Sequence, residues 1–152
     1  MRSILLIVDH AHLTREMTTV LKEVFTAASF HQVSSKQAAF FLQTHAKPDL
    51  IVYAPRAALG PMYNRFCTIR ALAVKAKILL YAEFRSVGPC LFDYLAAGAN
   101  GLLSTSSTTS EHYRALDTVM RGDSFVDDAT KRELLALKQI KLSEGKSNAL
   151  DF

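Results

Sequence analysis

Residues able to do chemistry gather first in the stretch "DHAH", where Asp9, His10 and His12 follow a short apolar run. A carboxylate and two imidazoles are all metal ligands, and each can also move a proton. Three neighbours in one loop rarely converge on an ion without a fourth ligand from elsewhere in the fold. The spacing therefore predicts no metal site, and we expect Asp9 to accept hydrogen bonds from loop N–H groups or to pair with Arg56 or Arg85.

A second stretch, "PDLIVYAP" at residues 48–55, has the shape of a buried strand that carries a reactive group to its end. The residue at that end is Ala54, whose methyl group is neither a nucleophile nor a ligand. The hydroxyl-rich stretch "STSSTTS" at 104–110 is typical of a turn that leads into a capped helix. Because no nucleophile is paired with a base in the sequence, we predict no enzymatic activity and no cofactor.

The composition indicates one globular domain. The chain has 152 residues, of which 49% are hydrophobic and 21% are charged, and its formal net charge is +4. The opening "MRSILLIVDH" has too few apolar residues for a signal peptide or a membrane span. Cys67 and Cys90 have no metal-binding spacing, which suits structural thiols in a reducing cytoplasm. Lys and Arg are scattered apart from the tail "KQIKLSEGK", so we predict no DNA contact for this chain.

Strands and helices alternate along the chain. Continuous aliphatic runs predict strands buried on both faces, and apolar residues at helical spacing predict the helices between them. Five such β-α units imply right-handed crossovers and a doubly wound parallel α/β sheet with helices on both faces. The expected strands are 3–8, 30–33, 50–54, 77–82 and 100–104, with 30–33 at the edge of the sheet, and the expected helices cover 13–25, 36–45, 62–73, 88–97, the stretch from Thr109 or Ser110 to Gly122, and 129 to about 140. The expected helix caps are Ser34 or Ser35, Thr109 or Ser110, and Asp127 or Asp128, and Gly98 is expected to end the helix at 88–97 in the left-handed conformation.

The working crevice of such a sheet lies beyond the carboxyl ends of its strands. The residues expected there are Asp9 and His10 after the first strand, Ala54 after the third, Ala82 after the fourth and 104–106 after the fifth.

The chain resembles the receiver domains of bacterial response regulators, and among them the NarL/FixJ (LuxR-type) branch. The resemblance covers residue 3 to about residue 135 and is carried by "ILLIVDHAHLTREM", "PDLIVYA", "GANGLLS" and "VMRGDSFVDDATKRELL", in that order and without large gaps. It implies a flavodoxin-like (βα)5 fold with strand order 2-1-3-4-5 and an extra C-terminal helix.

The same resemblance implies that the receiver chemistry is missing. The family accepts a phosphoryl group on an Asp that matches Ala54 here, and its acidic pair for Mg²⁺ has become Asp9 and His10. Its Thr or Ser after the fourth strand matches Ala82, and its Lys after the fifth strand matches Thr105. The aromatic residue of the fifth strand is replaced by Leu102. The chain therefore resembles a degenerate receiver, or pseudo-receiver, with an emptied phosphorylation pocket.

A related subgroup binds a cyclic dinucleotide through Trp-x-(Ser/Thr)-Arg, a motif that matches residues 125–128 here. Asp127 and Asp128 stand where a phosphate-gripping Arg would be needed, which argues against that ligand. The resemblance divides the chain into a receiver-like domain at 1–124, an extra helix at 125–141 and a linker-like tail at 142–152. In the family such a tail leads to a helix-turn-helix domain, so any DNA contact is expected through a domain outside this chain.

We therefore predict a non-enzymatic, phosphorylation-independent regulatory domain of a LuxR/NarL-type transcription regulator. It is expected in the cytoplasm, without a membrane contact, and to act as a homodimer or through a protein partner. Phe92, Tyr94 and Tyr113 are the candidate interface residues, although either core packing or exposure fits Phe92 and Tyr113. The alternative is a small-ligand sensor that uses the emptied crevice.

Overall fold

The computed structural model describes residues 2–10, 14–55, 61–84, 90–136 and 138. Six parallel strands form one sheet in the order β2-β1-β3-β4-β5-β6. The flavodoxin-like fold and the order of its first five strands agree with the sequence prediction. The strands are β1 Ser3–Val8, β2 Ser29–Val33, β3 Leu50–Ala54, β4 Lys77–Ala82, β5 Gly101–Ser104 and β6 Phe125–Val126.

Strand β6 was not predicted, because the sequence analysis assigned residues 125–141 to an extra helix. Phe125 N donates to Asn100 O at 3.1 Å and Asp127 N donates to Leu102 O at 3.3 Å, so this segment continues the ladder beside β5. Two residues are too few to show the alternation that identifies a strand in sequence. The helix itself begins later, and residues 128–136 are helical.

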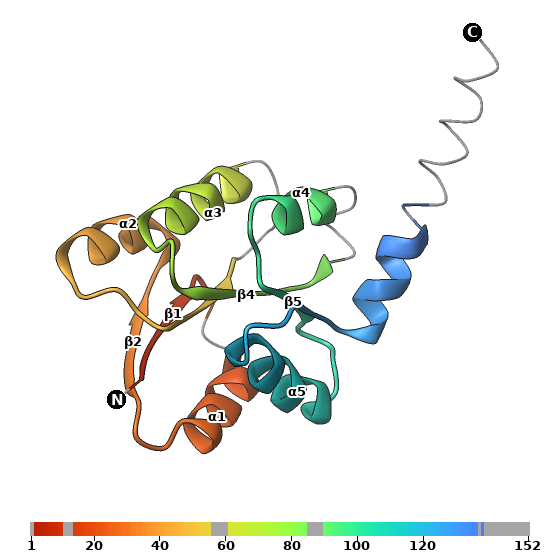
Figure 1. The fold of residues 1–152 in the computed structure, drawn as a ribbon, viewed down its shortest axis with the longest axis horizontal. Helices are drawn as coiled ribbons and strands as arrows, with labels where there is room; N and C mark the ends of the chain where they lie inside the picture. The colour runs from red at the N-terminus through yellow and green to blue at the C-terminus, as the bar shows by residue number, and fades with distance from the viewer. Residues whose placement is uncertain (1, 11–13, 56–60, 85–89, 137, 139–152) are drawn as a thin grey trace, which may run out of the picture.

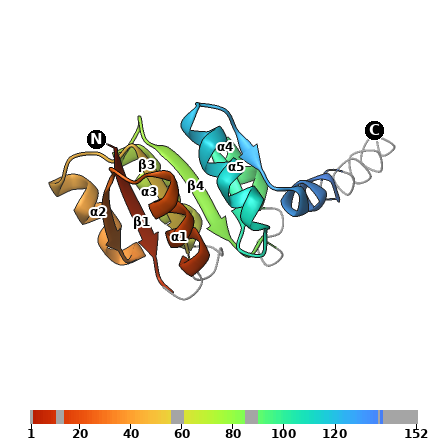
Figure 2. The same ribbon diagram turned by 90° about the horizontal axis from the view of Figure 1, so that it is seen from below.

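The helices cover both faces of the sheet (Figures 1 and 2). On one face α1 (Arg15–Val24) packs beside α5 (Thr109–Met120), and on the other lie α2 (Ser35–Thr44), α3 (Pro61–Leu72) and α4 (Cys90–Ala96). Alternate residues of the buried strands feed the two cores: Ile51 and Tyr53 belong to the α2–α3–α4 core, whereas Leu50 and Val52 belong to the α1–α5 core. No helix within the described residues is both long and apolar enough to cross a membrane.

Hydroxyl residues stand at the N-caps of α2 and α5. Ser34 caps α2, as predicted, and its N–H donates to Gln37 Oε1 at 3.4 Å. The predicted cap of α5 at Thr109 or Ser110 is wrong by one residue, because Thr108 Oγ1 accepts from Glu111 N at 3.1 Å. Its neighbour Thr109 is the first residue of the helix.

Arg70 fastens the edge of the sheet at which the strands begin. Its guanidinium donates to the carbonyls of Ala73, Val74 and Ala76 at 2.6–2.7 Å, to Gly98 O at 3.1 Å and to Asn100 Oδ1 at 3.2 Å. Gly98 has φ +106° and ends α4, as predicted, and an added Cβ there would lie 2.9 Å from Arg70 Cδ. The arginine thus joins the end of α3 to the starts of β4 and β5.

Candidate functional site: the crevice at the carboxyl edge of the sheet

A cavity of about 290 Å³ lies where β3, β4 and β5 end. Its walls come from residues that directly follow or finish these strands, together with one residue after β1. Four predicted site residues meet there. The lining residues are His10, Ala54, Pro55, Tyr81, Ala82, Glu83 and Thr105.

The middle of the crevice is walled by methyl groups. Ala54 and Ala82 end adjacent regions of the sheet and are only 6% and 5% exposed. Neither side chain offers an oxygen to a cation or to a phosphorus atom. Leu102, the fifth-strand residue predicted for this pocket, is fully buried in the α2–α3–α4 core and does not line the cavity.

Asp9 is the carboxylate of the predicted site, and it is turned toward the start of α2. Its Oδ1 accepts from Ser35 N at 3.0 Å and its Oδ2 accepts from Ser35 Oγ at 2.5 Å. The carboxylate therefore satisfies a backbone donor in the first turn of a helix, where negative charge is also favoured by the helix dipole. The expected donors were loop N–H groups, whereas the observed backbone donor is the first residue of α2; the alternative partners Arg56 and Arg85 lie outside the described residues.

Beneath the crevice, Tyr81 reaches a buried histidine. Tyr81 Oη lies 2.8 Å from His112 Nε2, and His112 Nδ1 lies 2.8 Å from the carbonyl oxygen of Thr108. Because a carbonyl only accepts, Nδ1 carries the proton, so in the neutral ring Nε2 accepts from the tyrosine hydroxyl. Burial, and secondarily the charge of Glu16, raises the pKa of Tyr81 to about 12.

Tyr53 is a second buried tyrosine beside the crevice, on the opposite face of the sheet. It is fully buried and stacks against Phe66 at 6.4 Å between ring centroids. Its hydroxyl lies near Ser35 but makes no hydrogen bond of ordinary geometry with the described residues. Burial raises the pKa of Tyr53 to about 12, and the charge of Asp9 acts in the same direction.

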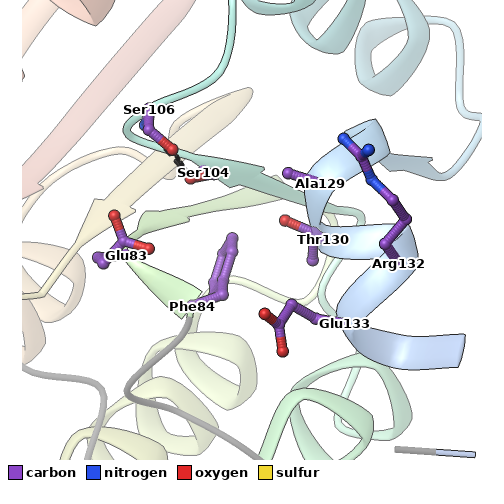
Figure 3. Close-up of a pocket in the computed structure, with 8 residues that line it drawn as sticks. All are labelled: Glu83, Phe84, Ser104, Ser106, Ala129, Thr130, Arg132 and Glu133. Carbon is purple, nitrogen blue, oxygen red and sulfur yellow. Dashed lines mark hydrogen bonds between the residues drawn. The ribbon is translucent and has the colours of Figure 1, made fainter. Parts of the chain in front are cut away.

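A neighbouring hollow of about 280 Å³ shares Glu83 with the crevice and extends to the C-terminal helix. Figure 3 shows the carboxylates of Glu83 and Glu133 on either side of the Phe84 ring. Ser104 and Thr130 line this hollow and are bound by Asp127, which is 1% exposed; its carboxylate accepts from Ser104 N at 3.0 Å and from Thr130 Oγ1 at 2.5 Å. Asp127 is therefore the cap of the helix, as the sequence predicted, and it fastens that helix to the end of β5.

The predicted interface residues separate in the structure. Tyr94 is fully buried and packs edge-on against Phe66 at 5.3 Å, so its place among the surface candidates is wrong. Phe92 is half-buried. Tyr113 is 36% exposed, and its hydroxyl donates to the carboxylate of Glu23 on α1.

Tyr81 and Glu83 also line the crevice and were not predicted as site residues. Tyr81 precedes Ala82 and Glu83 follows it, so their positions at the end of a predicted strand were the signal that could have found them. His112 and Glu16 lie far apart in the sequence, and no pattern or spacing relates them; only the fold brings α5 against α1. Within the described part of the chain, no group of three or more His, Cys, Asp or Glu side chains is placed to hold a metal ion; His12 lies outside that part.

Neither a protein-family model nor a curated protein sequence matches this chain. Solved structures do match its fold. A LuxR family DNA-binding response regulator from Silicibacter pomeroyi has a TM-score of 0.68 at 16% identity, over 85% of this chain and 98% of that one. A two-component response regulator of the LuxR family from Aurantimonas sp. SI85-9A1 has a TM-score of 0.69 at 21% identity, over 90% and 97%.

The isolated REC domain of RcsB from Salmonella enterica serovar Typhimurium, in its apo form, matches with a TM-score of 0.69 at 12% identity, over 88% of this chain and 98% of that domain. These neighbours are receiver domains of response regulators, or proteins that contain one. At such low identities the likeness establishes the receiver fold and leaves the function to the residues of the crevice.

Proposed function

We propose that this chain is a phosphorylation-independent regulatory domain, a pseudo-receiver, that acts through protein contacts and performs no enzymatic reaction. The observation that carries the proposal is Ala54, which ends β3 where a receiver needs its phosphoacceptor carboxylate. A methyl group cannot attack phosphorus, so no acyl phosphate can form at this position.

The surroundings of Ala54 support the same proposal. The Asp9 carboxylate accepts hydrogen bonds from Ser35. A magnesium ion bound at this edge would need several oxygen ligands, usually carboxylates. Thr105 lines the crevice where a receiver has its lysine, so no ammonium group is supplied from that position to neutralise a phosphate. Glu83 also lines the crevice, but it follows β4 and so does not occupy the acceptor position at the end of β3.

The direct test is phosphorylation by a small donor. The protein is incubated with acetyl phosphate and Mg²⁺, and intact mass is measured beside a receiver domain that retains its acceptor Asp. We expect no added phosphoryl group on this chain. Beryllofluoride, which mimics a bound phosphoryl group, is expected to leave the amide NMR spectrum unchanged. A magnesium-dependent mass increase by one phosphoryl group would overturn the proposal, and mapping it to Glu83 would identify the acceptor that the proposal overlooks.

The proposed domain organisation follows the family. Residues 1–124 would be the receiver-like domain, 125–141 the C-terminal segment and 142–152 a linker toward a helix-turn-helix domain of a LuxR/NarL-type regulator in the cytoplasm. Asp127 supports a coupling role for this segment, because it joins the end of β5 to the helix that follows. Dimerisation through Phe92 and Tyr113 belongs to the proposal, and sedimentation of the Tyr113→Arg variant against the parent chain tests it: an unchanged dimer would exclude this surface.

A second candidate function is a small-ligand sensor. The observation that favours it is the cavity of about 290 Å³, whose wall includes the polar side chains of His10, Glu83 and Thr105. A ligand that binds only the folded state raises the melting temperature as its concentration rises. A thermal-shift screen of metabolites on the parent chain and on an Ala82→Leu variant tests the idea, since a crevice ligand must lose its effect when leucine fills the cavity.

A further inference from the structure

The charged residues of this chain are unevenly divided along the sequence. Residues 24–82 hold seven of the 18 Lys and Arg residues but only one of the 14 Asp and Glu residues, Asp49. This range supplies β2, α2, β3, α3 and β4. The rest of the chain has more acidic than basic residues, so the net charge of +4 originates in this half of the fold.

Helices α2 and α3 present this half to the outside. They lie side by side on one face of the sheet (Figures 1 and 2), and neither contains an acidic residue. Within the described residues, no carboxylate forms an ion pair with Lys36 of α2 or Arg65 of α3. The one acidic residue of this half, Asp49, lies after α2 and accepts from Ser3 N at 2.8 Å.

A groove of about 370 Å³ runs between the two helices, which we call the α2–α3 groove. Two small residues of α2, Ala38 and Ala39, leave this space opposite α3. Lys36 and Arg65 are cationic residues along it, and Ile69 adds to its apolar floor. The lining residues are Ser35, Lys36, Ala38, Ala39, Asn64, Arg65, Thr68 and Ile69.

An aromatic side chain stands exposed beside the groove. Phe40 is 69% exposed and follows Lys36 by four residues, so the two lie one turn apart on the outward side of α2. An exposed phenyl ring suits protein recognition because interface centres favour aromatic residues and arginine, and Arg65 supplies an arginine along the same groove.

We propose that the α2–α3 groove binds an acidic amphipathic helix of a partner protein. A third helix can lay its apolar side against Ala38, Ala39 and Phe40 while its carboxylates meet Lys36 and Arg65. A nucleic acid fits less well, since its regular phosphates call for a dense basic face, whereas this groove has an aliphatic floor and two cations. The inference rests on the proposed function in one respect: it names a surface for the protein contacts through which the domain is proposed to act. It does not depend on whether the crevice is phosphorylated.

The test uses the full chain, labelled with ¹⁵N, and a synthetic peptide of about 20 residues with Glu on its polar face and Leu on its apolar face. We expect the peptide to shift amide signals from residues 35–44 and 61–72. The Lys36→Glu/Arg65→Glu variant should bind it at least about tenfold more weakly. The matched control, Arg121→Glu/Lys131→Glu, makes the same change of net charge elsewhere and should bind like the parent chain.

An Ala39→Leu variant checks the groove without changing charge, because leucine keeps helix propensity and fills the space; it should also weaken binding. No shift with the Glu/Leu peptide, equal binding of a Lys/Leu peptide, or shifts centred on α1 and α5 would overturn the proposal. Equal or tighter binding of a duplex oligonucleotide or of anionic phosphatidylserine vesicles through residues 35–44 would also overturn it. The phosphorylation experiment is read separately, so either proposal can fail while the other stands.

Discussion

The two ends of the sheet use polar side chains differently. At the edge where the strands begin, Arg70 alone satisfies four backbone carbonyls and Asn100, whose Oδ1 also accepts from Ile78 N at 2.8 Å. At the edge where the strands end, the site positions predicted from the receiver family hold Ala54, Ala82 and Thr105. The beginning of the sheet is fastened by a network, whereas its end surrounds a cavity.

Two carboxylates at the second edge, Asp9 and Asp127, accept hydrogen bonds from backbone and hydroxyl donors. Asp9 receives the N–H and hydroxyl of Ser35, and Asp127 receives Ser104 N and the hydroxyl of Thr130. A carboxylate that accepts such donors is stabilising because it replaces the water that backbone groups lose on burial. The comparison teaches that, within the described residues, these two carboxylates position strand and helix ends, whereas Ala54 and Ala82 present only methyl groups to the crevice.

The largest effect is expected at the beginning of the sheet. Arg70→Ala should lower the free energy of unfolding by about 2–4 kcal/mol, because it leaves several carbonyls of two loops without their donor. Urea denaturation followed by circular dichroism measures the change. Arg121→Ala is the matched control and should cost less than about 0.5 kcal/mol, since Arg121 is exposed and, among the described residues, its ion pair is with Asp117 at 3.3 Å. If both variants lost the same free energy of unfolding, the Arg70 network would not be what stabilises the edge at which the strands begin.

Asp127→Ala asks whether the second edge is also fastened. We expect a loss of about 1–3 kcal/mol, since the variant removes a helix cap and leaves the buried Ser104 N–H unsatisfied. Asp127→Asn is the control, because its amide oxygen can still accept from Ser104 and Thr130. If the alanine variant unfolded at the same urea concentration as the parent, the bonds of Asp127 between β5 and the C-terminal helix would make no measurable contribution to the free energy of unfolding.

Most of the strands and helices could be predicted from the sequence, whereas fewer of the contacts at the site could. Four aliphatic runs and the short edge stretch "FHQV" identified five strands, and Ala54, Ala82 and Thr105 were placed in one crevice because each follows or ends a predicted strand. Contacts between distant segments were out of reach: Tyr81 with His112, and Asp9 with Ser35, depend on how the elements pack. Tyr94 was misjudged because one helical turn without its neighbours does not reveal which side faces the core.

The α2–α3 groove was missed for a different reason. The basic residues form no dense stripe in the sequence, and the signal is instead the near absence of Asp and Glu between residues 24 and 82. Such an absence gains meaning only when the fold brings α2 and α3 together as one surface.

Alkaline pH probes the two buried tyrosines beside the crevice. Burial raises the pKa of both Tyr53 and Tyr81 from 10.0 to about 12, so between these values the unfolded chain loses its phenolic protons while the folded chain keeps them. Stability is therefore retained below about pH 10 and falls as the pH rises toward 12, by up to about 2 kcal/mol for each hydroxyl. Urea midpoints measured across this range should fall less steeply in a Tyr53→Phe/Tyr81→Phe variant, and an unchanged slope would contradict the assignment.

The smallest effect is expected from Tyr53→Phe at neutral pH, and it sharpens the comparison at a single atom. Removal of a buried hydroxyl without a hydrogen-bond partner among the described residues should change the free energy of unfolding by less than about 0.5 kcal/mol, and the variant can gain stability. Tyr81→Phe is the matched control: it removes the hydroxyl that donates to His112 Nε2 at 2.8 Å and should cost about 1–3 kcal/mol. Equal losses would mean that Tyr53 is as firmly bonded as Tyr81. A clear difference would place the unsatisfied hydroxyl, that of Tyr53, in the α2–α3–α4 core. The hydrogen-bonded hydroxyl, that of Tyr81, would lie in the α1–α5 core.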